Sequence, residues 1–115
     1  MSQSEWLPVD IQGLDPERPA RPIYEIKLNN KRLCLAYHGS EWYAVDARCP
    51  HANGPLGGGT LSDGAIVCPW HRFAFDLKTG QSDSGGYYIN TYPVKLKNQR
   101  LWVLLSPRKR WWKFW

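Results

Sequence analysis

Cysteine and histidine are both scarce in this sequence, with three of each among 115 residues. An odd and small number of cysteines, with no closely spaced pair, gives no sign of a disulfide framework. Long apolar runs are also missing, and the first ten residues lack the charged start and apolar stretch of a signal peptide. We therefore expect one domain, located in the cytoplasm.

Acidic residues are absent from the segment 107–115, whereas the whole chain has 15 basic and 10 acidic residues and a net charge of +5. Subtracting the four basic residues of this tail leaves 11 basic against 10 acidic, so the body carries only +1. A body with this balance is not a basic nucleic-acid-binding surface, and no nucleic acid partner is expected. The tail combines cations with aromatic rings, a composition that suits docking to a partner protein or to a membrane surface. Its residues are Arg108, Lys109, Arg110, Trp111, Trp112, Lys113, Phe114 and Trp115.

Helical periodicity is missing too, and the chain reads as short strands separated by turn residues. Residues 23–28, 33–37 and 42–46 predict an antiparallel meander, and residues 87–105 predict a final hairpin around Asn98 and Gln99. Residues 48–64 are rich in Gly and Pro and are expected to form one long loop without secondary structure. The predicted fold class is all-β, with antiparallel sheets and an inserted loop-rich subdomain.

The inserted region holds two cysteines and two histidines in two short brackets. Cys49 and His51 stand in "CPHANGPL", and after sixteen intervening residues Cys68 and His71 stand in "CPWH". Thiolate and imidazole are the protein ligands that soft and borderline metals prefer. Prolines stiffen both brackets, and glycines allow the backbone to approach a buried group closely. The spacing therefore predicts a metal centre held between two loops.

The same four residues also allow chance clustering, a structural zinc site with two cysteines and two histidines, or a catalytic cysteine–histidine pair. Zinc brackets usually pair Cys with Cys and His with His. A catalytic pair would leave the second Cys and His without a role. All three possibilities stay open on residue types and spacing alone.

The two brackets resemble the cluster loops of Rieske-type ferredoxins, and the likeness extends through "CPWHRFAFDLKTG" to Asp76 and Gly80. The resemblance implies a Rieske fold with a sandwich-like base and one 2Fe–2S cluster, bound by two cysteines on one iron and two histidines on the other. The ligands so implied are Cys49, His51, Cys68 and His71. It also implies a domain over residues 1–106, with a cluster-binding subdomain at about 46–86 and a separate tail at 107–115.

By the same resemblance, the chain is expected to be a one-electron carrier and not an independent enzyme. The expected partners are a flavin-dependent reductase and a terminal oxygenase or reductase. Two other functions stay open: a small subunit of an NAD(P)H nitrite reductase, and a redox-sensing binding module. Outside the two brackets only one histidine, His38, remains, so a second histidine-ligated catalytic iron is not expected.

Departures from the family concern the cluster's surroundings. Phe73 and Phe75 stand where the Rieske proteins of cytochrome bc complexes place hydroxyl-bearing Ser and Tyr. Without those donors to sulfur, we expect a reduction potential at the low end of the Rieske range, roughly −150 mV. Arg72 stands where many relatives have Gly. Its side chain is expected to be a solvated loop charge, or else to act in partner docking or in electrostatic tuning of the cluster. Cys34 is expected to be a buried core residue, and His38 to lie in a solvated turn.

Overall fold

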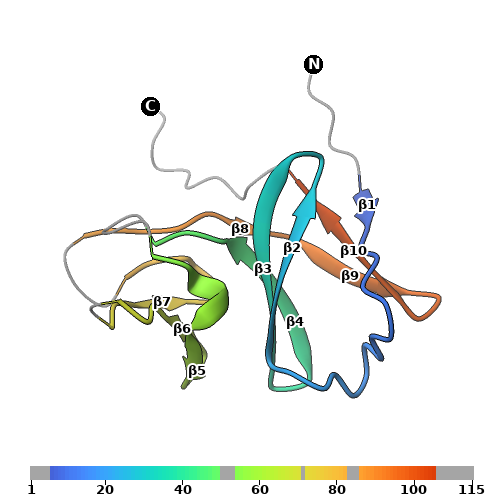
Figure 1. The fold of residues 1–115 in the computed structure, drawn as a ribbon, viewed down its shortest axis with the longest axis horizontal. Coiled ribbons are helices and arrows are strands. Elements are labelled where there is room, and N and C mark those ends of the chain that lie inside the picture. The colour runs from blue at the N-terminus through green and yellow to red at the C-terminus, as the bar shows by residue number, and fades with distance from the viewer. Residues whose placement is uncertain (1–5, 50–53, 71, 83–85, 106–115) are drawn as a thin grey trace.

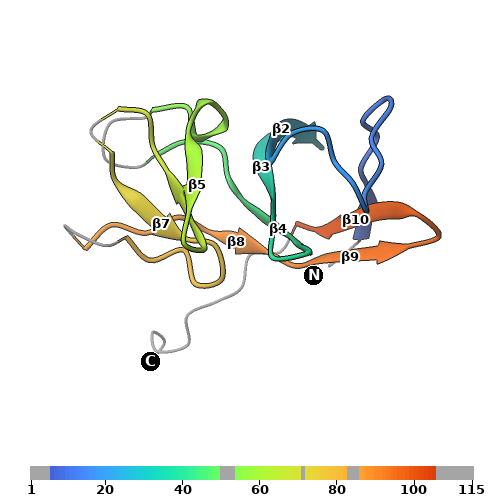
Figure 2. The ribbon, with the colours of Figure 1, turned by 90° about the horizontal axis from the view of Figure 1, so that it is seen from below.

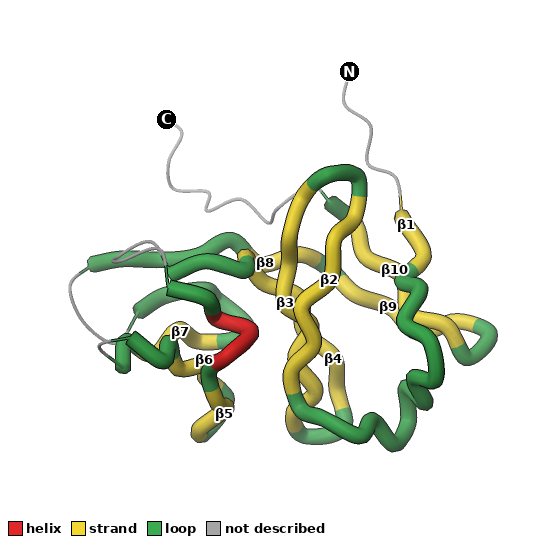
Figure 3. Tube along the Cα trace, viewed as in Figure 1, coloured by secondary structure: helices red, strands yellow, loops and turns green. Residues whose placement is uncertain are grey.

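The computed structural model describes residues 6–49, 54–70, 72–82 and 86–105 (Figure 1). Strands account for nearly all of its regular structure, which agrees with the predicted all-β class. The strands are β1 Trp6–Pro8, β2 Ile23–Leu28, β3 Lys31–His38, β4 Glu41–Asp46, β5 Thr60–Ser62, β6 Ala65–Val67, β7 Ala74–Asp76, β8 Thr91–Tyr92, β9 Val94–Lys97 and β10 Arg100–Leu104. A single 3-10 turn, η1 Leu56–Gly58, is the only helical element in these ranges (Figure 3).

The predicted meander is confirmed as the sheet β2-β3-β4, which β8 extends at the β4 edge. Asn29 and Asn30 connect β2 to β3 with φ values of 52° and 69°. Asn tolerates this left-handed region better than most residues, and a two-residue turn with both φ values positive matches the twist of a hairpin. His38 is the last residue of β3 and pairs with Glu41, so its predicted place in the turn is wrong by one residue.

A second sheet has the order β1-β10-β9, and Asn98 and Gln99 form the predicted hairpin turn with φ values of 55° and 62°. The two sheets enclose one apolar core, as expected for a sandwich-like base. Its buried members are Val9, Tyr24, Leu33, Leu35, Ala44, Tyr92, Leu101 and Val103.

The hairpin predicted over residues 87–105 is too long, because β8 and β9 belong to different sheets. Pro93 separates them and has no N–H to continue a ladder. On one side of it Tyr92 pairs with Ala44 of β4, and on the other Val94 pairs with Val103 of β10. The chain thus passes from one sheet of the base to the other at this proline.

A third sheet, β5-β6-β7, stands beside the base and carries the candidate metal loops (Figure 2). The expectation that residues 48–64 lack secondary structure is wrong, because this segment contains both η1 and β5. Both elements are only three residues long, too short to show a period in sequence. A second core joins this sheet to the base, and its buried members are Ile23, Cys34, Ala36, Val45, Ala47, Cys49, Leu56, Ile66, Cys68, Phe75, Leu77 and Ile89.

Within the described ranges, no helix has the length and apolar character that a membrane crossing requires.

Candidate metal centre

Cys49 and Cys68 lie at the bases of two loops that are closed in the same way. The amide of Cys49 donates to the carbonyl of Gly54 at 2.9 Å, and the amide of Cys68 donates to that of Phe73 at 2.8 Å. The first loop is further fixed by an isolated bridge between Arg48 and Pro55. Each cysteine is therefore held by its own backbone in a defined position.

Both cysteine side chains are fully buried, with 0% exposure, and they face each other across the two loops. The Cys49 thiol is a hydrogen-bonding neighbour of the Cys68 thiol. Burial raises the pKa of the Cys68 thiol, the Trp70 amide lowers it, and the nearby Cys49 raises it further. Since metal ligation requires the thiolate, a bound cation would have to offset the cost of burying this charge.

Groups from both loops approach the Cys68 sulfur closely. The Trp70 amide donates to Cys68 Sγ at 3.4 Å. A Cβ placed on Gly54 would lie 2.8 Å from the same sulfur and 3.2 Å from the Trp70 ring. Only a glycine fits here without displacing one of the two loops, so the loops meet at Gly54.

This arrangement fits an iron–sulfur cluster bound through two thiolates, because it offers paired sulfurs and a backbone donor to sulfur. His51 and His71, the other two predicted ligands, lie outside the described residues. In the described part of the chain, no group of three or more His, Cys, Asp or Glu side chains is close enough to hold a metal ion. Of the four predicted ligands, the structure brings Cys49 and Cys68 together.

Aromatic rings surround the second loop. Phe73 is partly buried, and its ring lies 5.6 Å from that of Tyr87, centroid to centroid. Phe75 is fully buried in the core that also contains both cysteines. Trp70 is 48% exposed, so the tip of this loop presents an aromatic side chain at the surface.

The remaining singled-out residues lie away from the loops or at their rim. Cys34 is fully buried in β3, as predicted, and burial raises the pKa of its thiol to about 12. His38 is half-buried at the end of β3, instead of lying in a solvated turn. Arg72 is exposed and has a φ of 58°, a left-handed conformation that glycine adopts more readily than arginine.

Sequence reasoning did not identify two contacts at this site: the Trp70 amide on sulfur and the close approach of Gly54. The first involves a backbone group, which any residue other than proline would supply. The second depends on how two loops meet in space. Neither leaves a residue-type signal beyond the glycine itself.

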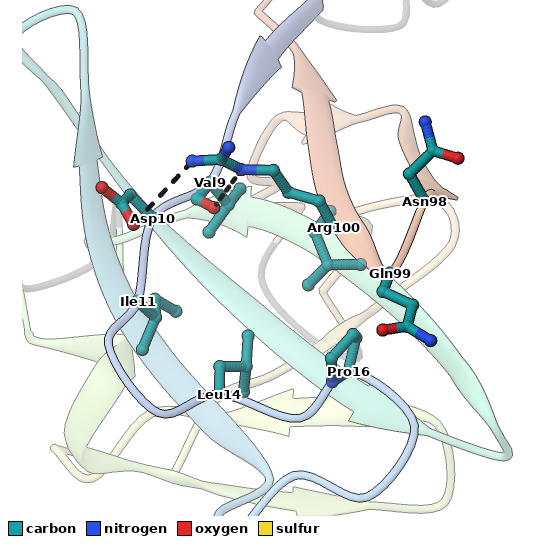
Figure 4. A pocket seen from close by; sticks show the side chains of 9 residues that line it. Val9, Asp10, Ile11, Leu14, Pro16, Asn98, Gln99 and Arg100 are labelled. Atoms are coloured by element: carbon teal, nitrogen blue, oxygen red, sulfur yellow. Dashed lines mark hydrogen bonds and ion pairs between the residues drawn. The ribbon is translucent and has the colours of Figure 1, made fainter.

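A separate pocket lies between the loop 9–16 and the β9–β10 turn (Figure 4). Arg100 donates to the carbonyl of Val9 at 3.4 Å and pairs with Asp10 at 3.8 Å. Both side chains are largely exposed, so the ion pair contributes little. Neither Cys49 nor Cys68 lines this pocket.

Comparison with known proteins agrees with the geometry. The model of the Rieske [2Fe-2S] domain family matches residues 11–93. The ferredoxin component of the naphthalene 1,2-dioxygenase/salicylate 5-hydroxylase systems of Ralstonia sp is 34% identical over 100 residues, with 85% of this chain and 95% of that protein covered. A human Rieske domain-containing protein is 38% identical over 87 residues, with 72% of this chain and 53% of that protein covered.

Some relatives are much longer than this chain. The match covers 71% of this chain but only 14% of human apoptosis-inducing factor 3, which is 31% identical. Among solved structures, a complex of reduced oxygenase and oxidised ferredoxin in carbazole 1,9a-dioxygenase matches with a TM-score of 0.76 and 24% identity, covering 94% of this chain and 100% of the matched chain. That likeness supports the fold. The chain belongs to the Rieske [2Fe-2S] domain family and has one Rieske-type 2Fe–2S cluster as its cofactor.

Proposed function

We propose that this chain is a Rieske-type ferredoxin, with a cluster bound by Cys49, His51, Cys68 and His71. A 2Fe–2S cluster accepts and releases one electron at a time, and its irons have no open position for a substrate. The observation that carries the proposal is the pair of buried, adjacent thiols at the bases of two loops that are closed in the same way. The role of the chain is then to carry electrons, without a catalytic site of its own.

The two histidines would ligate the iron nearer the surface and mark the place where the electron leaves. Trp70 and Arg72 flank His71 in sequence, and both are exposed. A partner that contacts these two side chains would approach the second loop. This supports electron transfer at the loop tips.

The proposed electron donor is a flavin-dependent reductase, and the proposed acceptor is a terminal oxygenase. Support comes from the relative named as the ferredoxin component of dioxygenase systems, which this chain covers almost completely. The carbazole 1,9a-dioxygenase complex pairs a ferredoxin of the same fold with its oxygenase. A location in the cytoplasm follows from this role and is part of the proposal.

The two alternative functions predict different experimental results. A small subunit of an NAD(P)H nitrite reductase would be recovered from cell extract in a stable complex with a large flavin or sirohaem chain. A redox-sensing module would change its affinity for a partner on reduction, without turnover. A carrier would form no stable complex and would be reduced rapidly by a flavin reductase.

The proposed domain spans residues 1–106, with the cluster-binding subdomain at about 46–86 and the tail at 107–115. The tail lies outside the described residues, and docking through it, to a partner or a membrane surface, is part of the proposal. Its sequence supports docking because four cations are interspersed with aromatic residues.

The ligand assignment is tested by single substitutions, with matched controls that the chain itself provides. Cys49→Ser, Cys68→Ser, His51→Ala and His71→Ala should each abolish or alter the EPR signal of the reduced cluster and lower the iron content. Cys34→Ala and His38→Ala remove the third cysteine and the third histidine, and both should retain the signal. A normal signal in any of the four ligand variants would contradict the assignment of that residue.

Electron transfer is tested with the holoprotein, a flavin reductase and NAD(P)H. We expect reduction of the visible absorbance at a rate that depends on the reductase concentration, and reoxidation when an oxygenase is added. A loaded cluster that no flavin reductase reduces would contradict the carrier role while leaving the ligand assignment intact.

A further inference from the structure

The sheet β1-β10-β9 has one face on the base core and one face that no described element covers. Leu101 and Val103 of β10 point into the core and are buried. Directly opposed residues of an antiparallel ladder share a face, and neighbours along a strand alternate between faces. Trp102 and its partners Pro8 and Lys95 therefore lie on the outer face. Figure 2 shows β9 and β10 along the margin of the molecule, with β2, β3 and β4 on the inner side of these two strands.

This outer face combines tryptophan with cations and has no carboxylate. By the same register it carries Trp6, Pro8, Lys95, Lys97, Arg100, Trp102 and Leu104. The three strands contain three basic residues and no Asp or Glu. Arg100 is tied to Val9 and Asp10 at one end, as Figure 4 shows, whereas Lys95 and Lys97 are exposed and have no acidic partner among the described residues.

The Trp6 ring on this face contacts a cation. The Lys95 ammonium lies 4.3 Å from the centroid of the Trp6 ring, although the two residues belong to opposite edge strands. The two side chains therefore meet over the central strand β10, where Trp102 lies. Cation–π contacts of this kind orient a ring without removing the positive charge from the surface.

Trp102 is only partly exposed on this face. Its Nε1 is buried and has no hydrogen-bond partner in the described structure. The face thus offers apolar ring surface and two exposed cations without an acidic partner among the described residues.

The basic–aromatic tail continues from the same sheet. β10 ends at Leu104, which pairs with Trp6, so the segment 107–115 follows from the end of the sheet where Trp6 stands. The tail adds four cations and no acid. Because both parts are cationic, charge complementarity opposes the tail as the cover of this face and favours one anionic partner for both.

We propose that the outer face of β1-β10-β9 is a docking surface for an anionic lipid bilayer. Trp and Lys or Arg together are typical of proteins at the membrane–water interface, where rings enter the headgroup region and cations meet lipid phosphates. Single-stranded nucleic acid is disfavoured, because binding it relies on a groove with rings free to stack on bases. Here Trp6 already contacts Lys95, and Trp102 is partly buried.

The location of this face suits an electron carrier. β5, β6 and β7, with the metal loops, lie on the opposite side of the molecule from β1, β9 and β10 (Figure 1). A chain bound to lipid through the base would leave the end of the molecule with β5, β6 and β7 free for a redox partner. The docking itself depends on none of the ligand residues and is independent of the electron-carrier proposal.

The test is co-sedimentation of the full-length holoprotein with phosphatidylcholine vesicles, with and without phosphatidylglycerol. The variant Lys95→Glu/Lys97→Glu reverses two charges on the face, and Lys27→Glu/Lys78→Glu makes the same charge change at exposed positions elsewhere. Each basic residue near an anionic surface contributes about a fivefold factor in binding. We expect the first variant to lose at least about tenfold in partitioning to anionic vesicles, and the control to stay within about threefold of the original chain.

Three outcomes would overturn the proposal. The first is no preference of the original chain for anionic over neutral vesicles. The second is equal loss in the two variants, which would reduce the effect to net charge or to the tail. The third is tighter binding to single-stranded oligothymidine than to vesicles, with the same dependence on Lys95 and Lys97, which would assign the face to nucleic acid. The visible spectrum of the cluster, measured for each variant, confirms that the fold is retained.

Discussion

Gly54 lies where the two metal loops touch, and its missing side chain is a requirement of the site. A Cβ there would stand 2.8 Å from Cys68 Sγ, closer than such atoms approach in folded proteins. We expect Gly54→Ala to lower the iron content per chain and to reduce the free energy of unfolding by about 1–3 kcal/mol, as overpacking does. Iron analysis and chemical unfolding of the holoprotein measure the two effects.

The control for this change is Gly58→Ala. A Cβ on Gly58 would meet nothing within 4 Å, and its φ is not in the left-handed region. Gly58→Ala should leave the iron content unchanged. If Gly54→Ala behaves in the same way, the two loops have room for a side chain between them and Gly54 is not required.

Arg72 combines an exposed side chain with a backbone conformation that disfavours it. Its φ of 58° lies in the left-handed region, where a residue with a Cβ costs roughly 1 kcal/mol relative to glycine. We therefore expect Arg72→Gly to raise the midpoint of thermal unfolding by a few degrees. Arg72→Ala keeps the Cβ and should not raise it, although it removes the same charge. An Arg72→Gly variant that is less stable would show that the arginine side chain makes stabilising contacts.

The Arg72→Gly variant also distinguishes a solvated loop charge at this position from a docking contact for the redox partner. A solvated loop charge can be removed without effect on electron transfer. A docking role predicts slower reduction of Arg72→Gly by the reductase at low ionic strength, and a smaller difference at high salt.

At the scale of elements, Asp46 at the end of β4 joins the base to the chain that returns from the metal loops. Its carboxylate accepts from the Tyr92 hydroxyl at 2.6 Å and from the Asn90 amide at 2.9 Å. The Asp46 amide donates to the Asn90 carbonyl at 3.1 Å. These contacts fix β8 against β4 immediately after the second irregular segment.

Removing the hydroxyl by Tyr92→Phe should lower the free energy of unfolding by about 1.5–3 kcal/mol, because Tyr92 is buried and its partner is charged. The control is Tyr37→Phe, since the Tyr37 hydroxyl only reaches the Glu17 carbonyl at 3.4 Å on the surface. That change should cost less than about 0.5 kcal/mol. Equal costs would show that the Asp46–Tyr92 contact is not stabilising.

The Tyr92 hydroxyl should also make the free energy of unfolding depend on pH. Burial, followed by the Asp46 carboxylate, raises the pKa of Tyr92 above its ordinary value of 10.0. The folded chain then keeps a proton that the unfolded chain loses, so the contribution is complete below pH 10 and declines as the pH rises above it. The difference in unfolding free energy between the original chain and Tyr92→Phe should shrink at up to about 1.4 kcal/mol per pH unit there. A constant difference across this range would contradict the raised pKa.

Elements whose conformation is set by neighbouring residues in the sequence could be predicted. Elements that depend on pairing with distant parts of the chain could not. The meander and the β9–β10 turn follow from alternating residues and from Asn29, Asn30 and Asn98, which adopt positive φ. The strand β5 has three residues and gains its stability from pairing with β6, which sequence alone does not show. Cys49 and Cys68 could be predicted as metal ligands because a metal centre requires rare residue types. The contact of the Trp70 amide could not, because every residue except proline has a backbone N–H.

At the scale of the whole molecule, the proposed functions occupy two separate ends. The metal loops stand on the third sheet, and the cationic face stands on β1-β10-β9 (Figures 1 and 2). The outer face lies on the other side of its sheet from the base core, so changes to it should leave the cluster environment intact. This separation is what allows docking and electron transfer to be varied independently.

Deletion of residues 107–115 tests the separation directly. The deletion starts beyond β10, so the visible and EPR spectra of the cluster should match those of the full chain. Removing four cations should weaken binding to anionic vesicles by at least about tenfold, and combining the deletion with Lys95→Glu/Lys97→Glu should weaken it further. If spectra, vesicle binding and electron-transfer rates are all unchanged, the tail has no docking role and the sheet face must act alone. If the deletion alters the cluster spectra, the two ends are coupled and the tail is not a separate segment.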